Sequence, residues 1–108
     1  MAELSVNGLQ LRPLRNELEW KGTRIELTKN EQLLAESLMQ RPGEVVSREA
    51  LLESLWDDVD FVDDNTLTVN VTRLRKKLES LGLPKAVETV RGIGYKLSMT
   101  NLSDGASK

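Results

Sequence analysis

Apolar and polar residues alternate along the first 27 residues of the chain, with a repeat of about two residues. The apolar positions here are Leu4, Val6, Leu9, Leu11, Leu18, Trp20, Ile25 and Leu27. Such alternation places one face of a strand in a core and the other in solvent. The dipeptides Asn7-Gly8 and Lys21-Gly22 favour tight turns between strands. The segment is therefore predicted to form an antiparallel β-meander.

Two helices are predicted next. Thr28 and Glu31 fit a capping box, in which each side chain accepts a free backbone N–H at the start of a helix. Arg41-Pro42-Gly43 ends this helix. After the short extended pair Val45-Val46, Ser47 is placed to cap a second helix. The apolar faces are expected at Leu33, Leu34, Leu38 and Met39 in the first helix, and at Leu51, Leu52, Leu55 and Trp56 in the second.

The longest helix is predicted to begin at Asp64 or Asn65 and to end at Leu81, before Gly82. Its apolar residues fall within a sector of about 80°, which makes a stripe that faces a core. They are Leu67, Val71, Leu74, Leu78 and Leu81. The opposite and flanking face is predicted to present Thr66, Val69, Asn70, Arg73, Lys76 and Lys77. That face carries no acidic residue before Glu79.

A β-hairpin is predicted after this helix. Val87–Arg91 and Tyr95–Met99 are rich in β-forming residues, and Gly92-Ile93-Gly94 between them allows a tight turn. Residues 100–108 are polar and are predicted to be disordered. A meander, three helices and a terminal hairpin make an α+β fold, with one domain over residues 1–99. The length of 108 residues also favours a single domain.

The composition excludes several kinds of site. The chain has no cysteine and no histidine, which removes disulfides, thiolate catalysis, the commonest zinc ligand and the commonest general base. No apolar run is long enough to cross a membrane or to act as a signal sequence. No group of residues is arranged for catalysis. A cytoplasmic binding domain without a metal or cofactor is therefore favoured over an enzyme.

The net charge of −2 conceals an uneven distribution. Residues 1–64 hold 7 basic and 14 acidic side chains, whereas residues 65–96 hold 7 basic and 2 acidic ones. The acidic residues are densest in the segment 56–64, at Asp57, Asp58, Asp60, Asp63 and Asp64. A polyanion would therefore bind to the second half of the chain and avoid this acidic segment.

The third helix and the hairpin carry side chains that suit duplex DNA. An arginine such as Arg73 can bond guanine in the major groove, and Val69 can pack on the methyl group of thymine. Arg91, at the hairpin turn, suits the negative potential of a minor groove. The candidates for phosphate contacts are Arg75, Lys76, Lys77 and the hydroxyls of Thr89 and Tyr95. The simpler alternatives are an amphipathic helix with a basic surface, and glycines that serve only the turn.

Five segments carry a resemblance to a known family. They are residues 26–31 (ELTKNE), 42–49 (PGEVVSRE), 55–56 (LW), 66–78 (TLTVNVTRLRKKL) and 88–97 (ETVRGIGYKL). In their order and spacing, they resemble the effector domain of OmpR/PhoB-type bacterial response regulators. That domain is a winged helix–turn–helix that binds DNA, and the resemblance covers residues 4–99. Residues 63–78 are most similar to regulators of antimicrobial-peptide or cell-envelope stress responses in Gram-positive bacteria.

The resemblance implies that the third helix enters the major groove and that the hairpin, called the wing, reaches the flanking minor groove. It assigns base contacts to Val69 and Arg73, and the minor-groove contact to Arg91. Further contacts to bases or phosphates are expected at Asn65, Thr66, Asn70, Thr72, Arg75, Lys76, Lys77, Thr89 and Tyr95. Some members have a basic residue in place of Asn65, and many have histidine in place of Asn70, so no operator sequence can be transferred.

The resemblance also implies partners. The segment 56–64 matches a family loop that can touch RNA polymerase, with Asp57, Asp58, Asp60 and Asp63 as the expected contacts. Alternatively, these acids only keep the loop solvated. The family's receiver domain is expected to lie outside this chain. In full-length relatives a histidine kinase phosphorylates the receiver, and two effector domains then bind direct repeats as a tandem dimer. The alternative function is a winged-helix docking module for another protein.

Overall fold

The computed structural model describes residues 3–56, 63–98 and 100. The first sheet has the order β1-β2-β3-β4 and consists of β1 (Leu4–Val6), β2 (Leu9–Arg12), β3 (Glu17–Trp20) and β4 (Thr23–Glu26). A short 3-10 turn, η1 (Pro13–Arg15), connects β2 to β3. The helices are α1 (Lys29–Met39), α2 (Arg48–Trp56) and α3 (Asp64–Ser80). The second sheet has the order β5-β7-β6 and consists of β5 (Val45–Ser47), β7 (Gly94–Leu97) and β6 (Val87–Val90).

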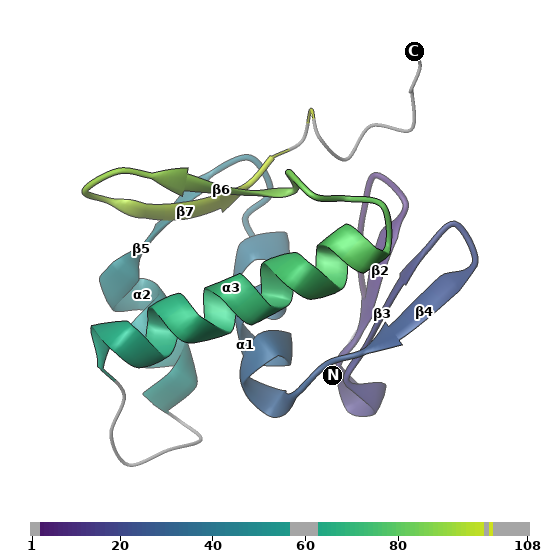
Figure 1. The fold of residues 1–108 in the computed structure, drawn as a ribbon, viewed down its shortest axis with the longest axis horizontal. Helices are drawn as coiled ribbons and strands as arrows, with labels where there is room; N and C mark the ends of the chain where they lie inside the picture. Colours follow the sequence, from purple (N-terminus) through teal and green to yellow (C-terminus); the bar gives the residue numbers. More distant parts are fainter. Residues whose placement is uncertain (1–2, 57–62, 99, 101–108) are drawn as a thin grey trace.

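The two sheets pack against different parts of the helical layer. Figure 1 shows α3 in front of α1 and α2. The first sheet lies beside the C-terminal end of α3, and the β6–β7 hairpin runs along the length of the helix. All strand pairs in both sheets are antiparallel. The predicted α+β winged-helix fold is therefore confirmed. In the described part of the chain, no helix has the length and apolarity that a membrane span requires.

The two tight turns predicted in the first 27 residues are present. Asn7 and Lys21 both adopt the left-handed conformation, with φ of 50°, at the first position of their turns. Gly8 and Gly22 follow with positive φ, which a type I′ hairpin turn requires. On the outer face of the first sheet, the Arg12 guanidinium lies 2.6 Å from a carboxylate oxygen of Glu19. That hydrogen bond raises the pKa of Arg12 above its ordinary value.

The predicted helix caps are also present. The backbone N–H of Thr28 donates to Glu31 Oε1 at 2.8 Å, and the N–H of Glu31 donates to Thr28 Oγ1 at 3.2 Å. Ser47 Oγ accepts the N–H of Ala50 at 3.1 Å at the start of α2. Asp63 caps α3 by accepting the N–H of Thr66 at 2.8 Å. These caps fix where each helix begins, because they satisfy N–H groups that no helix residue can reach.

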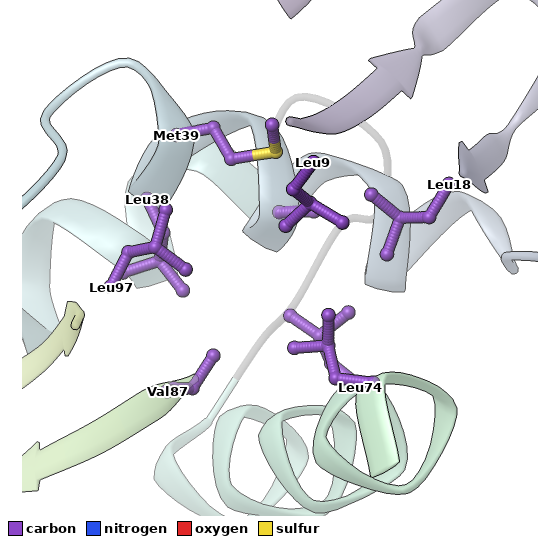
Figure 2. A pocket seen from close by; sticks show the side chains of 9 residues that line it. Leu9, Leu18, Leu38, Met39, Leu74, Val87 and Leu97 are labelled. Atoms are coloured by element: carbon purple, nitrogen blue, oxygen red, sulfur yellow. The ribbon is translucent and has the colours of Figure 1, made fainter. Parts of the chain in front are cut away.

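The core lies where α1, α3 and the two sheets meet. All five residues of the stripe predicted for the third helix are buried: Leu67, Val71, Leu74, Leu78 and Leu81. In Figure 2, Leu74 faces Leu9 and Leu18 of the first sheet, with Leu38, Met39, Val87 and Leu97 nearby. The gap between these side chains is only about 10 Å³ and has apolar walls, so it belongs to the core and is not a ligand site.

The second sheet differs from the prediction in two respects. The first hairpin strand ends at Val90, because Arg91, Gly92 and Ile93 form the turn, and the second strand begins one residue earlier than expected, at Gly94, and ends at Leu97. Residues 99 and 101–108, which include the end of the predicted second strand and the tail, lie outside the described residues. The extended pair Val45-Val46 becomes part of β5, which pairs with β7 in the register Val46↔Tyr95 and Ser47↔Gly94. The wing is therefore joined to the start of α2.

Gly94 permits the close approach of β5 and β7. A Cβ atom at this position would overlap the carbonyl oxygen of Val46 and lie 2.9 Å from Ser47 Cα. We expect Gly94→Ala to destabilise the chain by about 2–3 kcal/mol, since two backbones would have to separate. Gly22→Ala is the control, because its φ of +84° is strained but its surroundings are open. Urea unfolding should show the larger loss for Gly94→Ala; equal losses would contradict the steric argument.

Candidate nucleic-acid interface

The exposed face of α3 presents a row of unlike side chains. Asn65, Val69 and Arg73 are spaced four residues apart, which places them one above the other on the helix surface. All three are exposed, and Val69 is 37% exposed although it is a large apolar residue. Thr72 and Lys76 are exposed as well. Arg73 and Lys76 form no hydrogen bond or ion pair with any residue in the part of the chain that the structure describes.

Asn70 does not belong to this face, and the prediction that it is exposed is wrong. Its side chain is only 6% exposed, and Nδ2 donates to the carbonyl oxygen of Thr66 at 2.9 Å. The cause is its spacing: Asn70 lies three residues after Leu67 and four before Leu74, which places it beside the apolar stripe. The bond to Thr66 satisfies the amide within the helix, so burial costs little.

Lys77 is also directed away from the exposed row. Its Nζ lies 2.9 Å from Glu31 Oε1 and 2.7 Å from the carbonyl oxygen of Glu26. The Glu31 side chain is 2% exposed and the Lys77 side chain 31% exposed. The sequence predicted Lys77 on the outward face as a phosphate contact, but it joins the C-terminal half of α3 to the start of α1 and the end of β4. The ammonium supplies the charge that the buried carboxylate needs.

Arg75 joins α3 to the wing. Its Nη2 donates to Thr89 Oγ1 at 2.6 Å, and its Nε donates to the carbonyl oxygen of Val87 at 3.2 Å, both in β6. The guanidinium also lies 5.5 Å from the centre of the Tyr95 ring. Tyr95 itself is 5% exposed, so it does not offer the free surface hydroxyl that the sequence predicted. Arg75 remains half-buried and Thr89 exposed.

The tip of the wing is exposed. Arg91 opens the turn between β6 and β7 and has no bonded partner among the described residues. The N–H of Ile93 donates to the carbonyl oxygen of Val90 at 3.0 Å and closes the turn, while Gly92 supplies the positive φ of 78°. Ile93 is 54% exposed. The tip thus carries one free cation and one exposed apolar side chain.

Sequence reasoning missed Arg48, the first residue of α2. Its guanidinium donates to Tyr95 Oη at 3.1 Å, to Thr68 Oγ1 at 3.2 Å and to the carbonyl oxygen of Asp64 at 3.3 Å. Burial lowers the pKa of Arg48, but the bond to Tyr95 and the Asp64 carboxylate raise it further, so the net shift is upward. No periodicity identifies this residue; its place directly after the Ser47 cap is the one available signal.

The acidic segment is described only in part. Asp57, Asp58 and Asp60, which were predicted to contact RNA polymerase, lie outside the described residues. Asp63 is exposed and acts as the N-cap of α3. The hydrogen bonds from the backbone N–H and the hydroxyl of Thr66 lower the pKa of Asp63 below its ordinary value. A carboxylate at a helix N-terminus is further stabilised by the helix dipole.

The arrangement suits recognition of a polyanion. A helix row with a guanidinium, an amide and an apolar side chain lies near a hairpin with a free arginine at its tip, and the hydrogen bonds of Arg75 join the helix to the hairpin. Within the described residues, no group of three or more His, Cys, Asp or Glu side chains could hold a metal ion. The exposed cations and small polar groups are the kinds of side chain that contact phosphates and base edges.

Comparisons with known proteins agree with this geometry. The family described as transcriptional regulatory protein, C terminal, matches residues 22–97. The transcriptional regulatory protein YvcP of Bacillus subtilis is 49% identical over 96 residues, which are 89% of this chain and 40% of that protein. The sensory transduction protein BceR of B. subtilis is 55% identical over 71 residues, 66% of this chain and 31% of that protein. This chain thus spans less than half the length of these relatives.

Solved structures give the same result. The C-terminal domain of NsrR, a lantibiotic response regulator of nisin resistance, superposes with a TM-score of 0.79 and 41% identity. The alignment covers 89% of this chain and 97% of that one. The DNA-binding domain of RstA from Klebsiella pneumoniae, solved in complex with the RstA box, has a TM-score of 0.74 and 27% identity. It covers 92% of this chain and 99% of that one.

Lys77→Met should destabilise the fold, because it leaves the Glu31 carboxylate buried without its cation. We expect a loss of about 2–3 kcal/mol, below the usual cost of breaking a fully buried pair since Lys77 is about one-third exposed. Lys76→Met, one residue earlier and exposed, should change stability by less than about 0.5 kcal/mol. Chemical denaturation of both variants checks this. Equal stabilities would show that the pair is not structural.

Asp63 should make stability depend on pH. Because its pKa is lowered in the folded chain, its contribution is fully present above the ordinary aspartate pKa of about 3.9 and is lost as the pH falls through the lowered value. Asp63→Asn keeps a capping oxygen and removes the charge. We expect the unmodified chain to melt higher than this variant at pH 7, and the difference to shrink below pH 4. A difference that stays constant with pH would contradict the assignment.

Proposed function

The chain belongs to the family of C-terminal domains of transcriptional regulatory proteins, the DNA-binding domains of OmpR/PhoB-type response regulators, and we propose that it reads duplex DNA sequence-specifically through α3 and the wing. The family consists of transcription regulators, not enzymes. The observation that carries the proposal is the exposed row of Asn65, Val69 and Arg73 on α3, combined with a free Arg91 at the tip of the adjacent hairpin. These side chains are not needed by the fold, which leaves them available to a ligand.

In the proposed complex, α3 lies in the major groove. Arg73 bonds the O6 and N7 atoms of a guanine, and Val69 packs against a neighbouring thymine methyl group. Asn65 begins the exposed row and Thr66 and Thr72 lie beside the row, all three within reach of bases or phosphates. The planar cation of Arg73 favours guanine, whereas the apolar side chain of Val69, four residues away, favours thymine. This difference supplies the choice of sequence.

The wing and the flanks of α3 supply affinity. Arg91 enters the adjacent minor groove, where a narrow A·T-rich tract attracts an arginine most strongly. Lys76 binds a phosphate as a flexible point charge. Arg75 and Thr89 are already bonded to each other and add a contact to the backbone from the half-buried guanidinium. Asn70, Lys77 and Tyr95 contribute through the fold, since their polar groups are bonded inside the protein.

Further proposals concern the longer protein to which such a domain belongs. We propose that it acts in the cytoplasm, where bacterial duplex DNA lies, and that two copies bind direct repeats as a tandem dimer. A histidine kinase would control this assembly through a receiver domain, and the acidic segment before α3 would contact RNA polymerase. The relation to a nisin-resistance regulator supports a role in the response to antimicrobial peptides.

The experiment that tests the proposal is selection of duplexes from a random DNA library at about 100 mM salt. Recovery of one enriched half-site, above all as a repeat one helical turn apart, would support sequence-specific reading by a tandem pair. One isolated domain is expected to bind weakly, near the non-specific range of about 10⁻⁴ to 10⁻⁶ M. No binding at any salt concentration would overturn the proposal and favour a docking module for another protein.

Arg73→Ala and Lys76→Ala should have different effects on the recovered site. Arg73→Ala should weaken binding by about 1–3 kcal/mol and abolish the preference at one base pair, because a base contact is lost. Lys76→Ala should weaken binding to all sequences alike and make the salt slope shallower by about one, because a phosphate contact is lost. Titrations with matched and mismatched duplexes distinguish the two effects. If Arg73→Ala keeps the full preference, α3 does not read the site as proposed.

A further inference from the structure

Two arginines that come from different helices lie next to Tyr95. The Arg48 guanidinium, from α2, is 5.8 Å from the centre of the Tyr95 ring, and the Arg75 guanidinium, from α3, is 5.5 Å from it. The ring is 5% exposed, and its hydroxyl accepts a hydrogen bond from Arg48. The hydrogen bond holds Arg48 at the hydroxyl end of the ring, whereas Arg75 contacts the ring itself. A cation next to a buried ring is attracted more strongly than one at an exposed ring, since less water screens it. The three side chains therefore form one packed unit, which we call the arginine–tyrosine clamp.

Each arginine of the clamp extends to another element. Arg48 reaches Thr68 Oγ1 and the carbonyl oxygen of Asp64 in the first turns of α3. Arg75 reaches Thr89 Oγ1 and the carbonyl oxygen of Val87 in β6. The clamp thus binds the start of α2, two separate turns of α3 and both strands of the wing. These are the elements that carry Arg73 and Arg91.

Lysine could not replace Arg48 in this arrangement. Arg48 uses three nitrogens of one planar group on four acceptors, and the same plane lies near the ring. A lysine ammonium is a compact point charge and cannot span these four acceptors. The Asp64 carboxylate lies 3.4 Å from Arg48 Nε and reduces the repulsion between the two cations.

On the basis of the function proposed above, we propose that Arg48, Arg75 and Tyr95 are positioning residues that fix the wing relative to α3. The clamp thereby sets the spacing in DNA between the element read by Arg73 and the element read by Arg91. A rigid wing accepts one spacing, because one added base pair moves its target by about 3.4 Å along the duplex and also rotates it. A loosened wing would follow its target to other spacings, but would bind less tightly at the best one.

The test compares Arg48→Lys with Arg41→Lys. Arg41 lies after α1, pairs with Glu44 and is no part of the clamp, so its variant controls for the chemical change. The probe is the duplex recovered by selection, with its two elements identified as those whose preference is lost in Arg73→Ala and in Arg91→Ala. A second duplex carries one additional base pair between the two elements. Affinity for both duplexes is measured for each protein.

We expect the unmodified chain and Arg41→Lys to lose about tenfold or more on the duplex with the added base pair. Arg48→Lys should bind the best site more weakly but lose less than about threefold on the added base pair. A variant that is merely less folded would weaken both duplexes by the same factor and leave their ratio unchanged. An unchanged ratio for Arg48→Lys therefore overturns the proposal.

A measurement without DNA separates failure of this proposal from failure of the proposed function. Residual dipolar couplings of backbone N–H groups report the orientation of each element in the free chain. In the unmodified chain and in Arg41→Lys, the couplings of α3 and of β6–β7 should fit one alignment. In Arg48→Lys, the wing couplings should shrink while those of α1 and α3 persist. If they do not, the clamp does not position the wing, whatever the chain binds.

Discussion

The burial of one apolar stripe of α3 is the constraint on which the remaining structure depends. Leu67, Val71, Leu74 and Leu78 are each no more than 2% exposed. Each buried leucine stabilises the fold by about 1.5–3 kcal/mol, so the stripe fixes the rotation of α3 about its own axis. Once that rotation is fixed, Asn65, Val69 and Arg73 must face outward, since they lie on the opposite side of the helix. The core thereby selects which residues are available to a ligand.

The structure divides the cations of this region into two groups. Arg75 and Lys77 are bonded to the protein itself, through β6 and through the buried Glu31. Arg73, Lys76 and Arg91 have no bonded partner within the described ranges 3–56, 63–98 and 100. A positive charge that is bonded internally orients the helix and the wing, whereas a free one has all of its hydrogen-bond donors available for phosphates or bases. A count of basic residues in the sequence does not distinguish the internally bonded cations from the free ones.

Most of the fold could be predicted from local signals. The Thr28–Glu31 capping box and the apolar stripe of α3 depend on neighbours within one or two turns of chain, and both are confirmed. The errors arise at residues whose contacts come from distant segments of the chain. Nothing near Lys77 reveals that Glu31, 46 residues earlier, is buried beside it. Arg48 likewise acquires its role only when α3 and β7 fold against α2, and Gly94 only when β5 approaches β7.

Asn70 shows a different limit. A helical wheel places it beside the apolar stripe, where a polar residue either turns outward or bonds the backbone. The bond to Thr66 satisfies the amide inside the helix, and its burial follows. The candidate site could therefore be predicted as a face and as a chemical class, but not residue by residue. At the border of a helix face, the direction in which a side chain points depends on hydrogen bonds that form only in the folded chain.

The acidic composition of the chain does not conflict with binding to a polyanion. Its isoelectric point of about 5.2 lies far below the value of about 9 that marks many nucleic-acid-binding domains. At physiological salt, however, charges more than about 8–10 Å apart are largely screened. What a bound phosphate meets is therefore the local potential of the exposed face of α3 and of the wing, rather than that of the first sheet, which lies beside the C-terminal end of α3 (Figure 1). In that sheet, the carboxylates of Glu17 and Glu19 pair with Arg12 and Arg24, which offset much of their charge. Net charge thus describes the chain as a whole, while the distribution of charge over its faces decides which one a duplex meets.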